Sequence, residues 1–261
     1  MSPSTVRAYN PHEPTFGRSV TKVETERRRH AGSGESAPGS IAIDGPSAAG
    51  KSAVGGRVAR RLGYRFIDTG MMYRALTWLA HERKIDVTDE PALARLAEGV
   101  DLTLESGPPD APEAGRVRVD GVDVTDQLRS TEVGMAVSLV SRVPGVREAM
   151  VQSQRAMALQ GRVVMAGRDI GTVVLPDAPL KIYLDASVGE RERRRHEELR
   201  AMGRSETRQQ VHDELAHRDA IDSGRAVSPL RPAEDAVVID TDALSLEEVV
   251  ERILTLVPCH S

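Results

Sequence analysis

Residues 45–52 read Gly-Pro-Ser-Ala-Ala-Gly-Lys-Ser and directly follow the apolar stretch at 40–44. They match the pattern G-x-x-x-x-G-K-[ST], in which a glycine-rich loop joins a strand to a helix. The backbone N–H groups of such a loop point at phosphate oxygens, and the positive end of the helix faces the same anion. The segment therefore predicts a nucleotide-phosphate site in an α/β fold.

Two side chains of this loop have separate expected roles. Lys51 is expected to bind the β- and γ-phosphates, and the Ser52 hydroxyl is expected to bind Mg²⁺. A glycine-rich turn with a solvated lysine would share the pattern, but the helical spacing of Val54, Val58 and Leu62 after the loop favours the phosphate site. The predicted ATP-binding residues are Gly45, Pro46, Ser47, Ala48, Ala49, Gly50, Lys51, Ser52 and Ala53.

The order of the expected elements indicates the fold class. Strands are expected at 40–44, 64–68, 162–166, 180–185 and 236–240, and helices at 51–62, from 69 onward, and at 187–202, 205–221 and 246–256. This alternation predicts an α/β fold, with a parallel sheet flanked by helices. Residues 86–147 interrupt the alternation with a helix, two strands and the hairpin turn Asp120-Gly121, which predicts a small inserted α+β subdomain.

Composition excludes several classes of protein. The net charge of −4 argues against a general nucleic-acid binder, because such proteins carry a basic surface. The one cysteine, Cys259, can form no internal disulfide, and no apolar stretch is long enough to cross a bilayer. We therefore expect a cytoplasmic protein. Residues 1–38 are rich in proline, glycine and serine and lack the apolar core of a secretory signal, so we expect a disordered tail.

Polar side chains follow two of the expected strands. Asp68 and Thr69 come after the second strand, and Arg168 and Asp169 come after the third. Because ligands of open parallel sheets bind beyond the carboxyl ends of the strands, we expect these side chains to line the site.

An arginine-rich segment lies further along the chain, from Arg191 to Arg225. Arg218 and Asp222 are four residues apart and share a helix face, as a solvated ion pair would. A transferring phosphoryl group needs several cations around it, and the fork of arginine suits phosphate oxygens. Together with the phosphate loop, this favours a lid at about 190–226 that closes over the nucleotides.

From about Ile41 to Leu256 the chain resembles the bacterial cytidylate kinases, of the nucleoside monophosphate kinase group of P-loop kinases. The resemblance is carried by separate motifs in the same order, at 43–47, 50–52, 68–74, 167–172, 182–186, 218–225, 228–230 and 239–242. It implies transfer of a phosphoryl group from ATP, with Mg²⁺, to CMP or dCMP in pyrimidine nucleotide metabolism. It also implies one domain at 39–261, with a core at 39–85 and 148–261 and the insert at about 86–147, and we expect a monomer.

The resemblance implies roles for individual residues. The monophosphate of the acceptor would be bound by Arg74, Arg168 and Arg225, and its cytosine would be read by Ser138, Arg147 and Asp169. Its ribose would contact Arg218 and Asp222, and Thr69 and Tyr73 would line the same site. The residues expected to act in catalysis are Lys51, Arg168, Asp169 and Arg225.

Two positions depart from the pattern of this family. Ala48 stands where the family has glycine or another small residue, and we expect a usable loop only if φ is negative there. Ala166 stands where the family is acidic and helps to hold hydrated Mg²⁺, a role that Ser52, Asp44 or Asp169 would have to take over. A kinase for UMP or a modified pyrimidine nucleotide, and a protein that binds nucleotides without turnover, stay open as alternatives, whereas the motifs beyond the phosphate loop disfavour a shikimate-type kinase.

Overall fold

The computed structural model describes residues 39–105, 107 and 115–258. The predicted tail at 1–38 and residues 106 and 108–114 of the predicted insert lie outside these residues. In the described part, each helix and strand with predicted bounds is observed, and its ends lie within about three residues of the predicted ones.

Five parallel strands form the main sheet. They are β1 (Ile41–Asp44), β2 (Arg65–Asp68), β6 (Val163–Gly167), β7 (Leu180–Asp185) and β8 (Val237–Asp240), in the spatial order β2-β6-β1-β7-β8. The first strand is central and buried along its whole length, so the phosphate loop starts from the middle of the sheet. The predicted α/β fold with a parallel sheet is confirmed.

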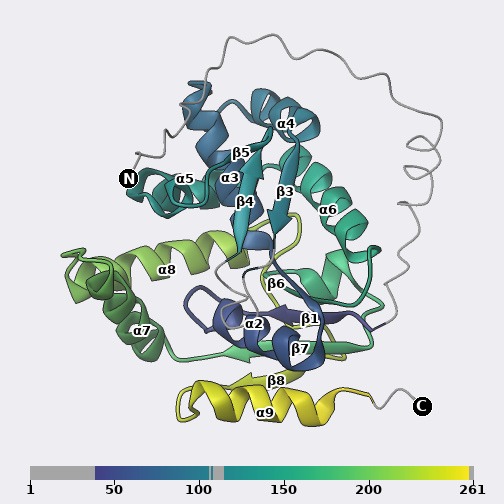
Figure 1. Ribbon diagram of the computed structural model, residues 1–261. Helices are drawn as coiled ribbons and strands as arrows, with labels where there is room; N and C mark the ends of the chain where they lie inside the picture. The colour runs from purple at the N-terminus through teal and green to yellow at the C-terminus, as the bar shows by residue number, and fades with distance from the viewer. Residues whose placement is uncertain (1–38, 106, 108–114, 259–261) are drawn as a thin grey trace, which may run out of the picture.

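Helices cover both faces of this sheet. On one face, α2 (Lys51–Leu62) and α9 (Leu246–Leu256) pack on a buried cluster that includes Ile43, Ile182 and Val250. On the other face, Met165 and Ile170 belong to a second cluster, which extends to the end of α6 (Pro144–Ala158). Figure 1 shows α9 along the β8 edge of the sheet.

A smaller unit lies above the main sheet in the view of Figure 1. Its antiparallel sheet contains β3 (Leu102–Glu105), β4 (Arg116–Val119) and β5 (Val122–Asp123). Its helices are α3 (Thr69–Glu82), α4 (Glu90–Gly99), the short 3₁₀ turn Gln127–Arg129 and α5 (Thr131–Ser141). One buried cluster joins Leu76, Leu93, Val119 and Met150, so α3 and α6 pack into the core of this unit. The domain boundaries given above stay a prediction.

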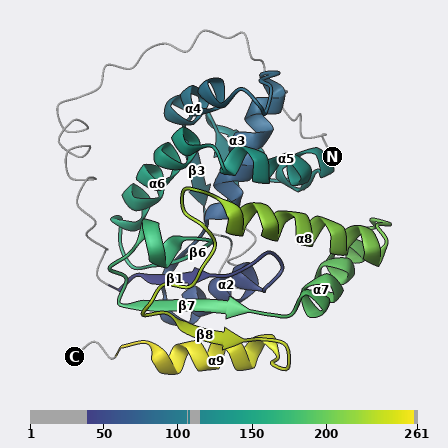
Figure 2. The same ribbon diagram turned by 180° about the vertical axis from the view of Figure 1, so that it is seen from behind.

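Two charged helices form a hairpin that projects from one side of the molecule, as both Figure 1 and Figure 2 show. They are α7 (Val188–Ala201) and α8 (Arg208–Gly224). Their shared buried cluster holds only Leu199, Val211 and Leu215, with Ala48 of the phosphate loop packed against it. A hairpin with so few apolar contacts can move as a unit more easily than the helices of the sheet. No helix in the described part of the chain is long and apolar enough to span a membrane.

Candidate active site

The phosphate loop curls between β1 and α2. Gly50, with a φ of 89°, is the N-cap of α2, and no side chain of the described residues caps that helix end. Gly45 has a φ of 151°, and a Cβ built there would lie 2.2 Å from the carbonyl oxygen of Leu184. The loop thus needs glycine at position 45 and leaves the N–H groups at the start of α2 available to an anion.

Ala48 departs from the expectation made for it. Its φ is 62°, so alanine occupies the left-handed region that we expected it to avoid. Such a conformation costs an alanine roughly 1–2 kcal/mol, which the packing of Ala48 against the α7–α8 cluster helps to offset. The expectation of a negative φ was wrong, and the loop keeps its curvature with alanine at this position.

Lys51 is buried at the bottom of the loop, and its Nζ donates to the carbonyl oxygen of Pro46 at 2.5 Å. Burial lowers the pKa of Lys51 well below its usual value, and Arg168 lowers it further, while Asp68 and Asp44 act in the opposite direction. A phosphate next to Nζ would favour the charged form and raise this pKa again.

A cleft of about 370 Å³ opens beside the phosphate loop. From the loop it is lined by Ser47, Ala48, Gly50, Lys51, Ser52 and Ala53, whereas Gly45, Pro46 and Ala49 do not reach it. The structure also brings together in this cleft every residue predicted for the acceptor site, namely Thr69, Tyr73, Arg74, Ser138, Arg147, Arg168, Asp169, Arg218, Asp222 and Arg225.

Asp222 of α8 organises the arginines on one side of the cleft. Its carboxylate accepts a hydrogen bond from Nε of Arg168 at 2.9 Å and lies 3.6 Å from Nη2 of Arg225. Burial would raise the pKa of Asp222, but Arg168 and Arg225 outweigh it and lower that pKa. Asp222 therefore stays ionised and fixes the positions of both guanidinium groups.

Positive charge in the cleft exceeds what the described residues neutralise. Burial, together with Arg168 and Arg74, lowers the pKa of Arg218 to about 10. Nε of Arg218 and Nη2 of Arg225 are buried and have no hydrogen-bond partner among the described residues. Buried donors of this kind are satisfied in native structures, so this part of the cleft suits an anion with several oxygens.

The floor of the cleft holds a buried ion pair between Arg147 of α6 and Asp169, which follows β6. The guanidinium of Arg147 also lies 5.5 Å from the centre of the Tyr73 ring. Burial raises the pKa of the Tyr73 hydroxyl to about 12, so this side chain is neutral at physiological pH.

Asp44 has a contact that sequence reasoning missed. Its two carboxylate oxygens accept hydrogen bonds from the backbone N–H groups of Ile170 and Gly171, each at 2.7 Å. These residues open a π-helical segment, Ile170–Val174, directly after Arg168 and Asp169. Neither Asp44 nor Asp169 is hydrogen-bonded to Ser52 among the described residues, since Asp44 binds this segment and Asp169 binds Arg147.

Asp68 was expected to line the site, and it does so, but it also makes a contact that the sequence did not predict. It ends β2, and its Oδ2 accepts a 2.6 Å hydrogen bond from the hydroxyl of Ser52. Its position after a strand was noted in the sequence, but the contact depends on how α2 packs beside β2. In the described part of the chain no group of three or more His, Cys, Asp or Glu side chains forms a metal site.

Arg191 of α7 was assigned only to the predicted lid, and its burial was not predicted: its side chain is only 5% exposed. It donates to the carbonyl oxygens of Ala186 and Ser47, at 3.0 and 3.3 Å, and pairs with Asp219 of α8 at 2.6 Å. It thus links the phosphate loop to both helices of the hairpin.

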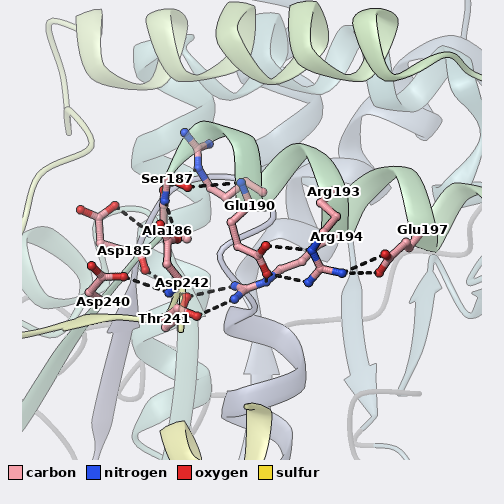
Figure 3. A network of polar contacts seen from close by, with 11 residues as sticks. Asp185, Ala186, Ser187, Glu190, Arg193, Arg194, Glu197, Asp240, Thr241 and Asp242 are labelled. Carbon is pink, nitrogen blue, oxygen red and sulfur yellow. Dashed lines mark hydrogen bonds and ion pairs between the residues drawn. The ribbon is translucent and has the colours of Figure 1, made fainter. Parts of the chain in front are cut away.

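Figure 3 shows how the base of the hairpin is attached to the sheet. Arg194 of α7 donates to the hydroxyl and the carbonyl oxygen of Thr241, which follows β8, at 3.0 and 2.6 Å. The hydroxyl of Thr241 in turn donates to the carbonyl oxygen of Asp185 at 3.0 Å, and Arg194 also pairs with Glu190. These contacts attach the first half of α7 to the end of β8.

Comparison with known proteins identifies the family of this chain. The family model "Cytidylate kinase" matches residues 41–259. A cytidylate kinase of Geobacillus sp. (strain WCH70) is 54% identical over 218 residues, covering 83% of this chain and 95% of that protein. The cytidylate kinase of Geobacillus kaustophilus (strain HTA426) is 55% identical, covering 84% and 96%. Among solved structures, a gluconokinase from Sinorhizobium meliloti 1021 is 17% identical, covers 85% of this chain and 92% of that one, and has a TM-score of 0.42. On the family model and the Geobacillus relatives, this chain belongs to the cytidylate kinase family.

Proposed function

We propose that this protein transfers the γ-phosphoryl group of ATP to CMP or dCMP, giving ADP and CDP or dCDP. The observation that carries the proposal is the set of arginines beside the phosphate loop, where Nε of Arg218 and Nη2 of Arg225 are buried without a hydrogen-bond partner among the described residues. The names of the curated relatives support a cytidine nucleotide as acceptor.

In this reaction an anionic oxygen of the acceptor phosphate attacks the γ-phosphorus in line, and the bond to the β-phosphate oxygen breaks. The attacking oxygen needs no strong general base, so the protein contributes position and charge. Lys51 would bind the β- and γ-phosphates, while Arg74, Arg168 and Arg225 would bind the acceptor phosphate. Mg²⁺, when bound with ATP, neutralises charge on the β- and γ-phosphate oxygens.

Selection of cytosine would come from the floor of the cleft. The carboxylate of Asp169 is an acceptor for the exocyclic amine of cytosine, and Arg147 and Ser138 supply donors beside it. Uracil carries an oxygen in place of that amine and would face the carboxylate without a hydrogen bond. Buried polar groups left unpaired give strong discrimination, so we expect UMP to be a poor acceptor.

An assay of ADP release with ATP, Mg²⁺ and a panel of CMP, dCMP, UMP and AMP tests the proposal. We expect turnover with CMP and dCMP well above turnover with the other two. Lys51→Ala should lower turnover by roughly 10²–10³-fold, as loss of one phosphate-stabilising charge does. Turnover of the variant at the wild-type rate would contradict the role given to the loop.

Ala166 motivates a second candidate, a catalytically impaired protein that binds nucleotides, or a kinase for another pyrimidine nucleotide. Its methyl group is buried in the apolar cluster under α2 and offers no carboxylate to the phosphate loop. Binding of ATP and CMP without turnover on any acceptor would favour this candidate, and Ala166→Asp would then be the next variant.

A monomer in the cytoplasm is the setting that we propose for this reaction. Residues of one chain supply every group of the site described above, so no second copy is required. Size-exclusion chromatography with light scattering would test the monomer, and fractionation of cells would test the location.

A further inference from the structure

The two strand ends beside the phosphate loop differ in the side chain that each presents, because one carries a carboxylate and the other a methyl group. In the sheet register Asp68 of β2 is paired directly with Ala166 of β6, so both side chains lie on the face covered by α2. The hydroxyl of Thr69 donates to the carbonyl oxygen of Ala166 at 2.9 Å and holds the two strand ends together. Ala166 is 1% exposed and apolar, so of this pair only Asp68 brings a charge to the loop.

The hydrogen bond between Asp68 and the phosphate loop has a defined direction. The Ser52 hydroxyl donates its proton to Oδ2 of Asp68, which leaves the lone pairs of the serine oxygen free for another partner. Oδ1 of the same carboxylate accepts from the backbone N–H of Gly70 at 2.9 Å and so fixes the orientation of the group. Both Ser52 and Asp68 line the cleft beside Lys51.

A carboxylate that orients a hydroxyl ligand also makes that ligand more basic and adds negative charge near the metal. From this geometry we propose that Asp68 is the positioning residue of the magnesium site, holding Ser52 Oγ toward the Mg²⁺ of the bound nucleotide and supplying the carboxylate that Ala166 lacks. This rests on the proposed function, because the metal arrives with ATP or ADP.

The alternative role of Asp68 is structural. Its side chain is the N-cap of α3, and a cap alone would have no influence on metal binding. Asp68→Asn separates the two roles, because asparagine caps helices as well as aspartate does but carries no charge. Glu198→Gln is the matched control, since Glu198 lines the same cleft and pairs with Arg195 rather than with the phosphate loop.

The experiment is calorimetric titration of the full chain with ADP, once with Mg²⁺ and once with EDTA. The ratio of the two affinities measures the coupling between metal and nucleotide and needs no turnover. We expect Asp68→Asn to lower this ratio by roughly 10–100-fold, the usual effect of losing an outer partner of a metal ligand. Glu198→Gln should keep the wild-type ratio, and the melting temperature of Asp68→Asn should stay close to that of the wild type.

A rescue variant sharpens the test. In Asp68→Asn/Ala166→Asp the carboxylate moves to the neighbouring strand end on the same face, so part of the lost ratio should return. An unchanged ratio in Asp68→Asn overturns the inference and leaves the proposed function intact. A wild-type chain that binds ADP equally with Mg²⁺ and with EDTA also overturns the inference alone, whereas one that binds no ADP at all overturns the proposed function as well.

Discussion

Arg147 and Asp169 form an ion pair in which the side chains are only 2% and 6% exposed. Arg147 comes from α6, which packs into the smaller unit, and Asp169 follows a strand of the main sheet. Arg147 also donates to the carbonyl oxygen of Ser141 at 3.3 Å. The pair therefore joins the two halves of the cleft at the point where the acceptor base is expected to bind.

Loss of one member of this pair should cost more than loss of both. Arg147→Met leaves a buried carboxylate without its partner, and we expect it to lower the free energy of unfolding by about 3–5 kcal/mol. Arg147→Met/Asp169→Asn removes both charges and should be more stable than either single variant. Urea denaturation of the four proteins in this cycle measures the difference. A single variant within about 1 kcal/mol of the wild type would show that the pair is not closed off from water.

Asp44 should give the stability a distinctive pH dependence. Its burial raises its pKa to about 6, although hydrogen bonds from Gly171 and Ile170 oppose this. Smaller effects come from Asp169, which raises the pKa further, and from Lys51, which lowers it. Between pH 4 and 6 the folded state keeps a proton that the unfolded chain has lost, so stability falls as pH rises through this window.

Asp44→Asn has no titrating group at this position, so comparing it with the wild type isolates the contribution of the Asp44 carboxyl. The free energy of unfolding of the variant, relative to the wild type, should increase by up to about 3 kcal/mol from pH 4 to pH 6 and then level off. The hydrogen bonds that asparagine alters add an offset that does not depend on pH. A difference between the two proteins that is flat across this window would show that the Asp44 carboxyl titrates near its usual pKa.

Arg191 should matter for ATP more than for the acceptor. Arg191→Met keeps the apolar stem but removes the donors to Ser47 and Ala186 and the pairing with Asp219. Hydrogen bonds to charged groups contribute about 1.5–3 kcal/mol, so we expect kcat/KM for ATP to fall roughly 10–100-fold with a smaller change in the KM for CMP.

Arg193→Met is the matched control for this prediction. Arg193 lies on the same helix and is 49% exposed, and it pairs only with Glu190 and Glu197 in the described part of the molecule. Exposed pairs contribute little, so its steady-state constants should stay near the wild-type values. If Arg193→Met changed the steady-state constants as much as Arg191→Met does, the change would come from loss of charge on α7 in general and not from the contacts of Arg191.

Much of the fold could be predicted because the evidence is local. Each strand of the main sheet is a short apolar run, and each flanking helix repeats its apolar residues with helical spacing. The capping box of Ser245 and Glu248 at the start of α9 likewise depends only on residues within a segment of four. The loop residues that line the cleft were predicted from their pattern, and Asp68, Thr69, Arg168 and Asp169 were predicted from their positions after strands. The other residues of the acceptor site were predicted from a resemblance to a family, and the structure brings them together with the first two groups.

What could not be predicted depends on contacts between distant segments. The π-helical segment at 170–174 forms where its N–H groups meet Asp44, which lies more than a hundred residues earlier. Arg191 belongs to a charged run, and a charged run indicates solvent exposure until the packing of α8 against α7 is known. The φ of Ala48 was predicted wrongly because the preference of one residue was weighed without the curvature that the whole loop imposes.

Two glycines should respond very differently to alanine. Gly63 ends α2 with a φ of 67°, and a Cβ there would meet no atom within 4 Å, so Gly63→Ala carries only conformational strain. We expect a cost of about 1 kcal/mol and a fall in melting temperature of about 2–4 °C for a chain of this size. Gly45→Ala would add a Cβ 2.2 Å from the backbone carbonyl of Leu184, in the strand paired with β1. Because that carbonyl cannot move without disturbing the sheet, we expect a further 1–3 kcal/mol and weaker ATP binding. Thermal unfolding measures the stability of both variants, and calorimetry measures their binding of ATP. If the two variants were equally stable, β7 would have moved to make room for the added Cβ.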